Sequence, residues 1–179
     1  MKRLKKLYNE DIRKKLKQDF NLPNINMVPK IKKVSINIGI GKFRDKIDTL
    51  SKIASDLYKI TGQKPHITKS KKAISGFKLR GGDIVGLHLT LRGNAMYEFI
   101  EKLLSIGLPR VRDFRGISLK SFDKNHNYTY AIKEHIIFPE ISYDRIEDIY
   151  GFQATFNIKS NNKEQSIALL KEMGFPFKK

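Results

Sequence analysis

The sequence predicts an α+β fold in which a single, mainly antiparallel sheet has helices packed on one face. Segments whose apolar residues alternate with polar ones, as in half-buried strands, are interleaved with segments whose apolar residues recur every three or four positions, as in helices. With 179 residues, of which 40% are hydrophobic, the chain can bury a substantial core. We therefore expect residues 1–179 to form one domain.

The first part of the chain predicts a helix, a strand and a second helix. A helical stripe over 3–20 consists of Leu4, Leu7, Tyr8, Ile12, Leu16 and Phe20. The strand follows from the alternation of Val34, Ile36, Ile38 and Ile40 with small polar residues. Apolar residues from Ile47 to Leu57 predict the next helix, which ends at Gly62. We expect 63–82 to be basic extended chain and loop.

The second part predicts three strands and two helices. Val85, Leu87, Leu89 and Leu91 alternate with polar residues and mark a strand. The range 94–107 has helical spacing and stops at Gly107. Two further strands are expected over 128–138 and 152–159, and a last helix over 164–173, before Gly174. No internal repeat interrupts this order.

The charge is strongly basic and unevenly distributed. The chain has 36 Lys and Arg against 18 Asp and Glu, a net charge of +18. Residues 1–80 contain 22 basic and 6 acidic side chains, whereas residues 81–179 contain 14 and 12. Such asymmetry indicates a polyanionic partner on one surface, with nucleic acid favoured over an anionic membrane. Only the stripe over 3–20 is suitable for a membrane surface, and we expect it to pack on the sheet instead.

The usual signatures of enzymes and cofactor sites are missing from the sequence. Cysteine is absent, and the longest uninterrupted apolar run has four residues, so neither thiol chemistry nor a membrane span is expected. The glycines near Lys42 fail the Walker pattern at Ile36 and Phe43 and the dinucleotide pattern at Arg44. The four histidines have no metal-ligand spacing. We expect no catalytic residues, no metal and no cofactor.

The polar face of the two clearest strands favours structured RNA. Its residues are small or hydrogen-bonding: Ser35, Asn37, Gly39 and Gly41 on one strand, and Gly86, His88, Thr90 and Arg92 on the other. Small side chains let a sugar–phosphate backbone come close, and Asn and Thr can exchange hydrogen bonds with ribose hydroxyls. We expect this face to be free to bind RNA; the alternative is that a loop of the same chain covers it.

Several ordered motifs resemble one known family. They are Gly62-Gln63-Lys64-Pro65-His66-Ile67-Thr68-Lys69-Ser70-Lys71-Lys72, Gly76-Phe77-Lys78-Leu79-Arg80, Thr90-Leu91-Arg92-Gly93, Pro109-Arg110-Val111-Arg112-Asp113-Phe114-Arg115-Gly116, Lys120-Ser121-Phe122-Asp123 and Ile136-Ile137-Phe138-Pro139-Glu140. From Tyr8 to Phe177 the chain resembles the bacterial-type 5S rRNA-binding protein family of the large ribosomal subunit, the universal family uL5. The alternative is a non-ribosomal protein that binds structured RNA.

The resemblance implies a sheet that docks on 5S rRNA, with neighbouring large-subunit rRNA and ribosomal proteins around it in the central protuberance. In the family motifs, the positions that contact RNA correspond to Asn37, Gln63 and Thr90 of this sequence. Lys64, Lys69, Lys71, Lys72 and Arg92 are then expected at phosphates, where they position the RNA without specifying it. The full expected rRNA-binding set is Asn37, Gly39, Gly41, Gln63, Lys64, Lys69, Lys71, Lys72, Thr90 and Arg92.

The resemblance also implies two contacts away from 5S rRNA. An exposed basic loop near 75–82 is expected to reach the P-site tRNA through Gly76, Phe77, Lys78 and Arg80. The small residues of Gly81-Gly82-Asp83 are expected to make the loop tip more flexible. The region of Arg110, Arg112, Asp113 and Arg115 is expected to meet a small-subunit head protein in an intersubunit bridge. We expect acidic residues to add charge complementarity there: Glu140, Asp144, Glu147 and Asp148. The expected location is the cytoplasmic ribosome, or an organelle stroma or matrix if the gene lies in an organelle.

Overall fold

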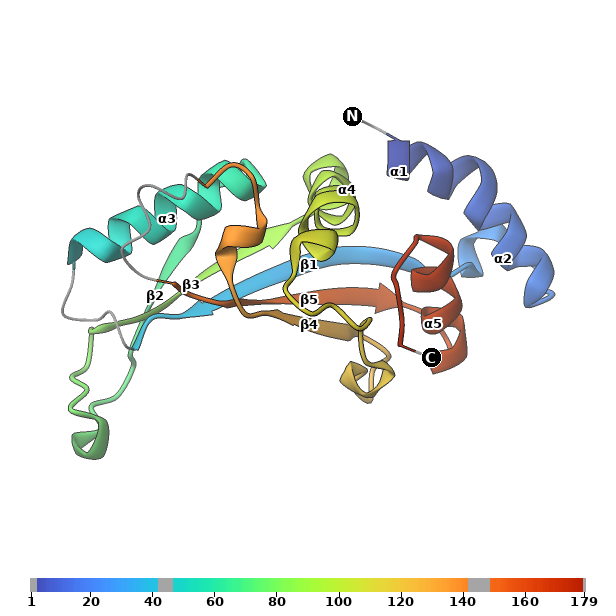
Figure 1. The fold of residues 1–179 in the computed structure, drawn as a ribbon. Coiled ribbons are helices and arrows are strands. Elements are labelled where there is room, and N and C mark those ends of the chain that lie inside the picture. Colours follow the sequence, from blue (N-terminus) through green and yellow to red (C-terminus); the bar gives the residue numbers. More distant parts are fainter. Residues whose placement is uncertain (1–2, 42–46, 142–148, 179) are drawn as a thin grey trace.

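The computed structural model describes residues 3–41, 47–141 and 149–178 and contains one five-stranded sheet (Figure 1). The strands are β1 (Lys30–Gly39), β2 (His66–Lys69), β3 (Ile84–Leu91), β4 (Tyr128–Ile132) and β5 (Phe152–Lys159). Their order across the sheet is β2-β3-β1-β5-β4, and every neighbouring pair is antiparallel. The predicted α+β class with an antiparallel sheet is confirmed.

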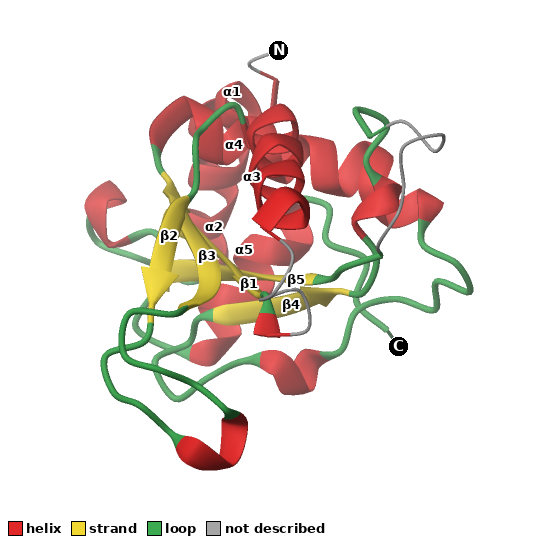
Figure 2. Cartoon of the chain, turned by 90° about the vertical axis from the view of Figure 1, so that its left-hand side faces the viewer, coloured by secondary structure: helices red, strands yellow, loops and turns green. Residues whose placement is uncertain are grey.

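The helices form the second layer of the fold. Besides short 3-10 turns and π-helical segments, they are α1 (Arg3–Leu7), α2 (Arg13–Asp19), α3 (Ile47–Thr61), α4 (Gly93–Lys102) and α5 (Lys163–Glu172). Helices α3 and α4 lie over one face of the sheet, while α2 lies beside α5 near the end of the sheet where β1 begins and β5 ends (Figures 1 and 2). The opposite face carries no α-helix among the described residues (Figure 2).

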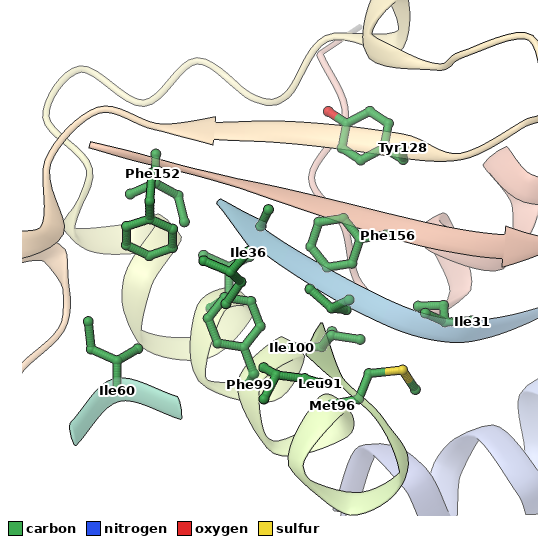
Figure 3. Packing of buried hydrophobic residues seen from close by; sticks show 14 of the residues in the cluster. Ile31, Ile36, Ile60, Leu91, Met96, Phe99, Ile100, Tyr128, Phe152 and Phe156 are labelled. Atoms are coloured by element: carbon green, nitrogen blue, oxygen red, sulfur yellow. The ribbon is translucent and has the colours of Figure 1, made fainter. Parts of the chain in front are cut away.

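A single hydrophobic core joins the sheet to its helices. In Figure 3, Ile36 of β1 points toward Phe99 of α4, and Met96 and Ile100 of α4 extend the same layer. These four side chains are at most 2% exposed. Alternation along β1 and β3 is the cause, because it turns every second side chain toward the helices and leaves the polar ones on the far face.

The first helix contains a wider turn in its middle. A π-helical segment, Tyr8–Ile12, connects α1 to α2. Leu4, Tyr8, Ile12 and Leu16 are all buried and are spaced four residues apart. Because a regular α-helix has about 3.6 residues per turn, side chains with this spacing would gradually rotate around the helix. The π turn compensates by keeping all four on one side. This stripe packs with α4 and α5, so the expectation that it would lie on the sheet needs correction.

The predicted strand over 128–138 is too long. Strand β4 ends at Ile132, and His135–Ile137 form a 3-10 turn. The buried His135 ring stacks on Tyr150 with 3.8 Å between ring centroids, and its backbone N–H donates to the Tyr150 carbonyl over 3.0 Å. The apolar residues after β4 therefore contribute to the core through a turn. None of the helices in the described part of the chain is long and apolar enough to cross a membrane.

Candidate RNA interface

The face of the sheet opposite α4 carries ordered rows of polar side chains. Strand register aligns one row across β3, β1, β5 and β4, consisting of Thr90, Ser35, Thr155 and Thr129. A second row crosses all five strands and consists of His66, His88, Asn37, Gln153 and Ala131. Asn37, Gln153 and Ala131 are exposed, so no loop among the described residues covers this part of the face.

Three residues that the family resemblance singled out lie together on this face. The Gln63 side-chain amide donates a hydrogen bond to the Thr90 carbonyl over 3.3 Å. The Thr90 hydroxyl lies 3.5 Å from Nε2 of His88, which is directly opposite Asn37 in the strand register. The fold thus gathers Asn37, Gln63 and Thr90 from a strand, a helix-to-strand connection and a second strand. Such a fixed set of donors and acceptors suits a hydrogen-bonded partner.

Glycines on this face serve two different purposes. Nothing in the described chain lies within 4 Å of a Cβ built on Gly39 or Gly41. Their small size is not demanded by the protein's own packing, and it leaves room for an approaching backbone. Gly86, which we expected to face outward, is buried instead. A Cβ there would lie 2.6 Å from the Ile38 carbonyl oxygen, so that glycine is required by the pairing of β3 with β1.

The charge on the sheet is entirely positive. None of the five described strands contains Asp or Glu, and they carry Lys30, Lys32, Lys33, Lys69 and Lys159. Lys64 and Arg92 are exposed at the ends of connecting segments, close in sequence to Gln63 and Thr90. Lys71 and Lys72 lie beyond β2 in the connection to β3. A surface with this charge attracts phosphates and repels basic proteins.

The connection between β2 and β3 projects away from the sheet as a hairpin-like loop (Figures 1 and 2). Its tip is a 3-10 turn at Ser75–Phe77, and the Phe77 side chain is 76% exposed. Residues 71–78, including Gly76 and Lys78, are all exposed, as is Arg80. The exposed basic loop expected near 75–82 is therefore present at that place in the chain.

The glycine pair of this loop lies at its base and not at its tip. The Gly82 N–H donates to the Ser70 carbonyl over 2.9 Å. The Asp83 carboxylate accepts from the backbone N–H of Arg80 over 2.8 Å. Gly82 and Asp83 therefore close the loop at its base, against β2 and β3.

A second exposed basic segment lies beside β4. Arg110, Arg112, Asp113 and Arg115 are all exposed, and Asp113 adopts a positive φ of 51°. A cavity of about 330 Å³ separates part of this segment from the edge of the sheet. Its lining comes from both sides and consists of Val111, Arg112, Asp113, Phe114, Arg115, Gly116, Tyr130, Ala131, Ile132, Lys133, Glu134 and Ile137.

The acidic complement expected for this region is not supported at Glu140. That carboxylate lies 2.6 Å from the Lys102 ammonium group, which also donates to the Ile60 carbonyl over 2.8 Å. Glu140 is thus committed to an internal ion pair with Lys102 of α4, and the same lysine joins α4 to the end of α3 through the Ile60 carbonyl. Asp144, Glu147 and Asp148 lie outside the described residues.

Sequence reasoning missed the contribution of β5 to the polar face. Gln153 is the direct neighbour of Asn37, and Thr155 is the direct neighbour of Ser35. The alternation over 152–159 predicts a strand with polar residues on one side, but a local pattern does not show which strands are neighbours in the sheet. Only the pairing of β5 with β1 shows that these side chains continue the same surface.

Comparisons with known proteins show the family of the chain. The family model described as "Ribosomal protein L5" matches residues 24–80, and the model for the C-terminus of the same ribosomal family matches residues 84–177. The chain is 49% identical to large ribosomal subunit protein uL5 of Synechococcus sp. (strain RCC307) over 175 residues, which is 98% of each chain. It is 50% identical to uL5 of Pelagibacter ubique, with 98% of this chain and 95% of the relative covered. It is also 49% identical to uL5c of Gracilaria tenuistipitata var. liui, with 97% of each covered. With both regions matched and near-complete coverage at about half identity, the chain belongs to the ribosomal protein L5 family of the large ribosomal subunit.

Proposed function

We propose that this structural protein of the large ribosomal subunit binds 5S rRNA through the polar face of its sheet and helps to attach that RNA in the central protuberance. The single observation that carries the proposal is the gathering of Asn37, Gln63 and Thr90 on an exposed face whose strands contain no acidic residue. Family membership favours a ribosomal RNA over a non-ribosomal one.

Two kinds of group on the face contribute to binding: hydrogen-bonding groups and positively charged groups. Asn37 and Thr90 supply hydrogen-bonding groups that strand pairing holds in place, and Gln63 is held by its bond to the Thr90 carbonyl, so little ordering accompanies binding. Lys64, Lys69, Lys71, Lys72 and Arg92 supply charge for phosphates. Gly39 and Gly41 leave space for the RNA backbone.

Two finer contacts complete the proposal. The projecting loop touches the P-site tRNA through its exposed tip, at Gly76, Phe77, Lys78 and Arg80. The segment containing Arg110, Arg112, Asp113 and Arg115 meets a small-subunit head protein in an intersubunit bridge. The loop and this segment are separate in the fold, since one lies beyond β2 and β3 and the other beside β4.

Direct binding tests the main proposal. The purified chain is titrated with 5S rRNA and with a scrambled RNA of equal length and composition, in the same salt. We expect at least about a thousandfold preference for 5S rRNA, the lower end of the usual ratio between specific and non-specific nucleic-acid binding. Equal affinity for the two RNAs would reject the proposal and leave only electrostatic attraction.

A further inference from the structure

The polar rows continue past β1 onto strands that come from the less basic part of the chain. Strand β5 lies between β1 and β4 and presents Gln153, Thr155 and Asn157 on the same face as Asn37. Strand β4 adds Thr129, whose hydroxyl lies 3.2 Å from that of Thr155. A substantial part of the sheet face therefore belongs to residues beyond position 120.

We infer that 5S rRNA contacts β5 as well as β1 and β3, with Gln153 and Thr155 as binding residues; this rests on the proposed function. Directly opposite residues on one face of an antiparallel pair have Cβ atoms about 5 Å apart. Gln153 is opposite Asn37, and Thr155 is opposite Ser35. An RNA backbone that reaches the Asn37 side chain is then within hydrogen-bonding reach of Gln153.

The chemistry of this part of the face fits an RNA partner better than a protein. Gln153 is exposed, while Thr155, Asn157 and Thr129 are half-buried and carry hydroxyl or amide groups. The face lacks the large apolar side chains that anchor protein interfaces, and β5 contributes only a basic residue, Lys159, as charge. Amides and hydroxyls on an acid-free surface match ribose hydroxyls and phosphate oxygens.

A matched pair of glutamine substitutions tests the inference. Gln153→Glu places a carboxylate beside Asn37, whereas Gln18→Glu makes the same change on exposed α2, remote from the sheet face. We expect Gln153→Glu to weaken 5S rRNA binding by about tenfold and Gln18→Glu by less than about twofold, because phosphate repulsion is felt only within roughly a Debye length. Thermal unfolding of each variant checks that the fold is intact.

A hydroxyl deletion keeps the test independent of added charge. Thr155→Val preserves the shape of the side chain and is expected to lower affinity by about threefold or more through the missing hydrogen bond. If Gln153→Glu and Thr155→Val both bind like the wild type while Asn37→Ala is weakened, the RNA is confined to β1 and β3 and the inference is overturned. If the wild type itself shows no preference for 5S rRNA, it is the proposed function that fails.

Discussion

The sheet face and the projecting loop are both basic, yet the protein holds them in very different ways. Side chains on the face are fixed by strand pairing on both sides of β1, and Gln63 is tied to Thr90 by a hydrogen bond. The loop is closed by backbone hydrogen bonds at its base and by one Ile74–Leu79 bridge, while residues 71–78 remain exposed. In the proposed function, the face is a preformed surface for specific recognition, and the loop is a projecting element whose contacts depend on charge and on Phe77.

Glycine substitutions give the largest expected difference between the two regions. Gly86→Ala places a methyl group 2.6 Å from the Ile38 carbonyl, and we expect it to lower the free energy of unfolding by about 2–3 kcal/mol. Gly76→Ala at the loop tip meets nothing within 4 Å and should change it by less than about 0.5 kcal/mol. Urea denaturation of both variants measures the contrast. Equal costs would show that β3 adjusts to the extra methyl group.

Removal of a fixed hydrogen-bonding group on the face is the next largest effect. Asn37→Ala and Thr90→Ala are each expected to weaken 5S rRNA binding by about 1–3 kcal/mol, because each leaves a desolvated RNA group without its partner. Asn9→Ala, at an exposed position on the first helix, is the matched control and should bind normally. Filter binding at fixed salt is the measurement. Normal affinity of both folded face variants would exclude the sheet as the binding surface.

Lysines at the start of the loop should act through charge alone. Lys71→Ala and Lys72→Ala are expected to weaken binding modestly and to reduce the slope of log affinity against log salt by about 0.7–0.9 for each phosphate that the lysine no longer neutralises. Lys171→Ala, at an exposed position of α5, serves as the control and should leave the slope unchanged. A slope that matches the wild type in the loop variants would assign these lysines to solvent or to another partner.

The loop tip should be separable from 5S rRNA binding altogether. Phe77→Ala removes a side chain that is 76% exposed, so stability should change by less than about 0.5 kcal/mol. Affinity for 5S rRNA should stay within about twofold, while crosslinking to P-site tRNA in assembled ribosomes should fall, since an exposed aromatic ring is a stacking group for RNA. A parallel drop in 5S rRNA affinity would mean that loop and face bind as one surface.

The smallest effect we expect is a pH dependence of stability that comes from His135, in the 3-10 turn after β4. Burial lowers the pKa of His135, whose Nδ1 accepts a hydrogen bond from the Tyr150 N–H over 3.4 Å. As pH falls through the unfolded-state pKa of about 6.5, the unfolded chain takes up this proton first, so stability decreases. His135→Phe keeps an aromatic ring against Tyr150 but cannot titrate.

Stability measured at pH 7.5 and pH 5.5 tests this proton linkage. The difference between the two values should be smaller in His135→Phe than in the wild type, whereas the exposed control His66→Gln should keep the wild-type difference. If His135→Phe retains the full difference, another group accounts for the acid sensitivity.

Sequence and structure agree best where the pattern is local. The alternation from Val34 to Ile40 describes one strand, and its apolar residues are buried as expected. In the predicted helical stripe, Leu4, Tyr8, Ile12 and Leu16 are buried, but Leu7 is 41% exposed. The strand predicted over 128–138 is too long, because a run of apolar residues in a 3-10 turn looks the same in the sequence as the end of a buried strand. From the sequence, Glu140 is expected to face a partner protein, but in the structure it forms an internal ion pair with Lys102, which is distant in sequence.

By itself the sequence determined most of the elements, the α+β class, the excess of positive charge and the family, since all of these depend on residue identity and short-range spacing. It also pointed to Asn37 and Thr90 through the alternation of their strands. The tertiary structure decided which strands are neighbours. By sequence, residues 1–80 hold most of the excess charge, but β1 pairs with β5 on one side and β3 on the other, so the polar face combines both parts of the chain. Strand order follows from long-range packing of the core, which no local pattern contains.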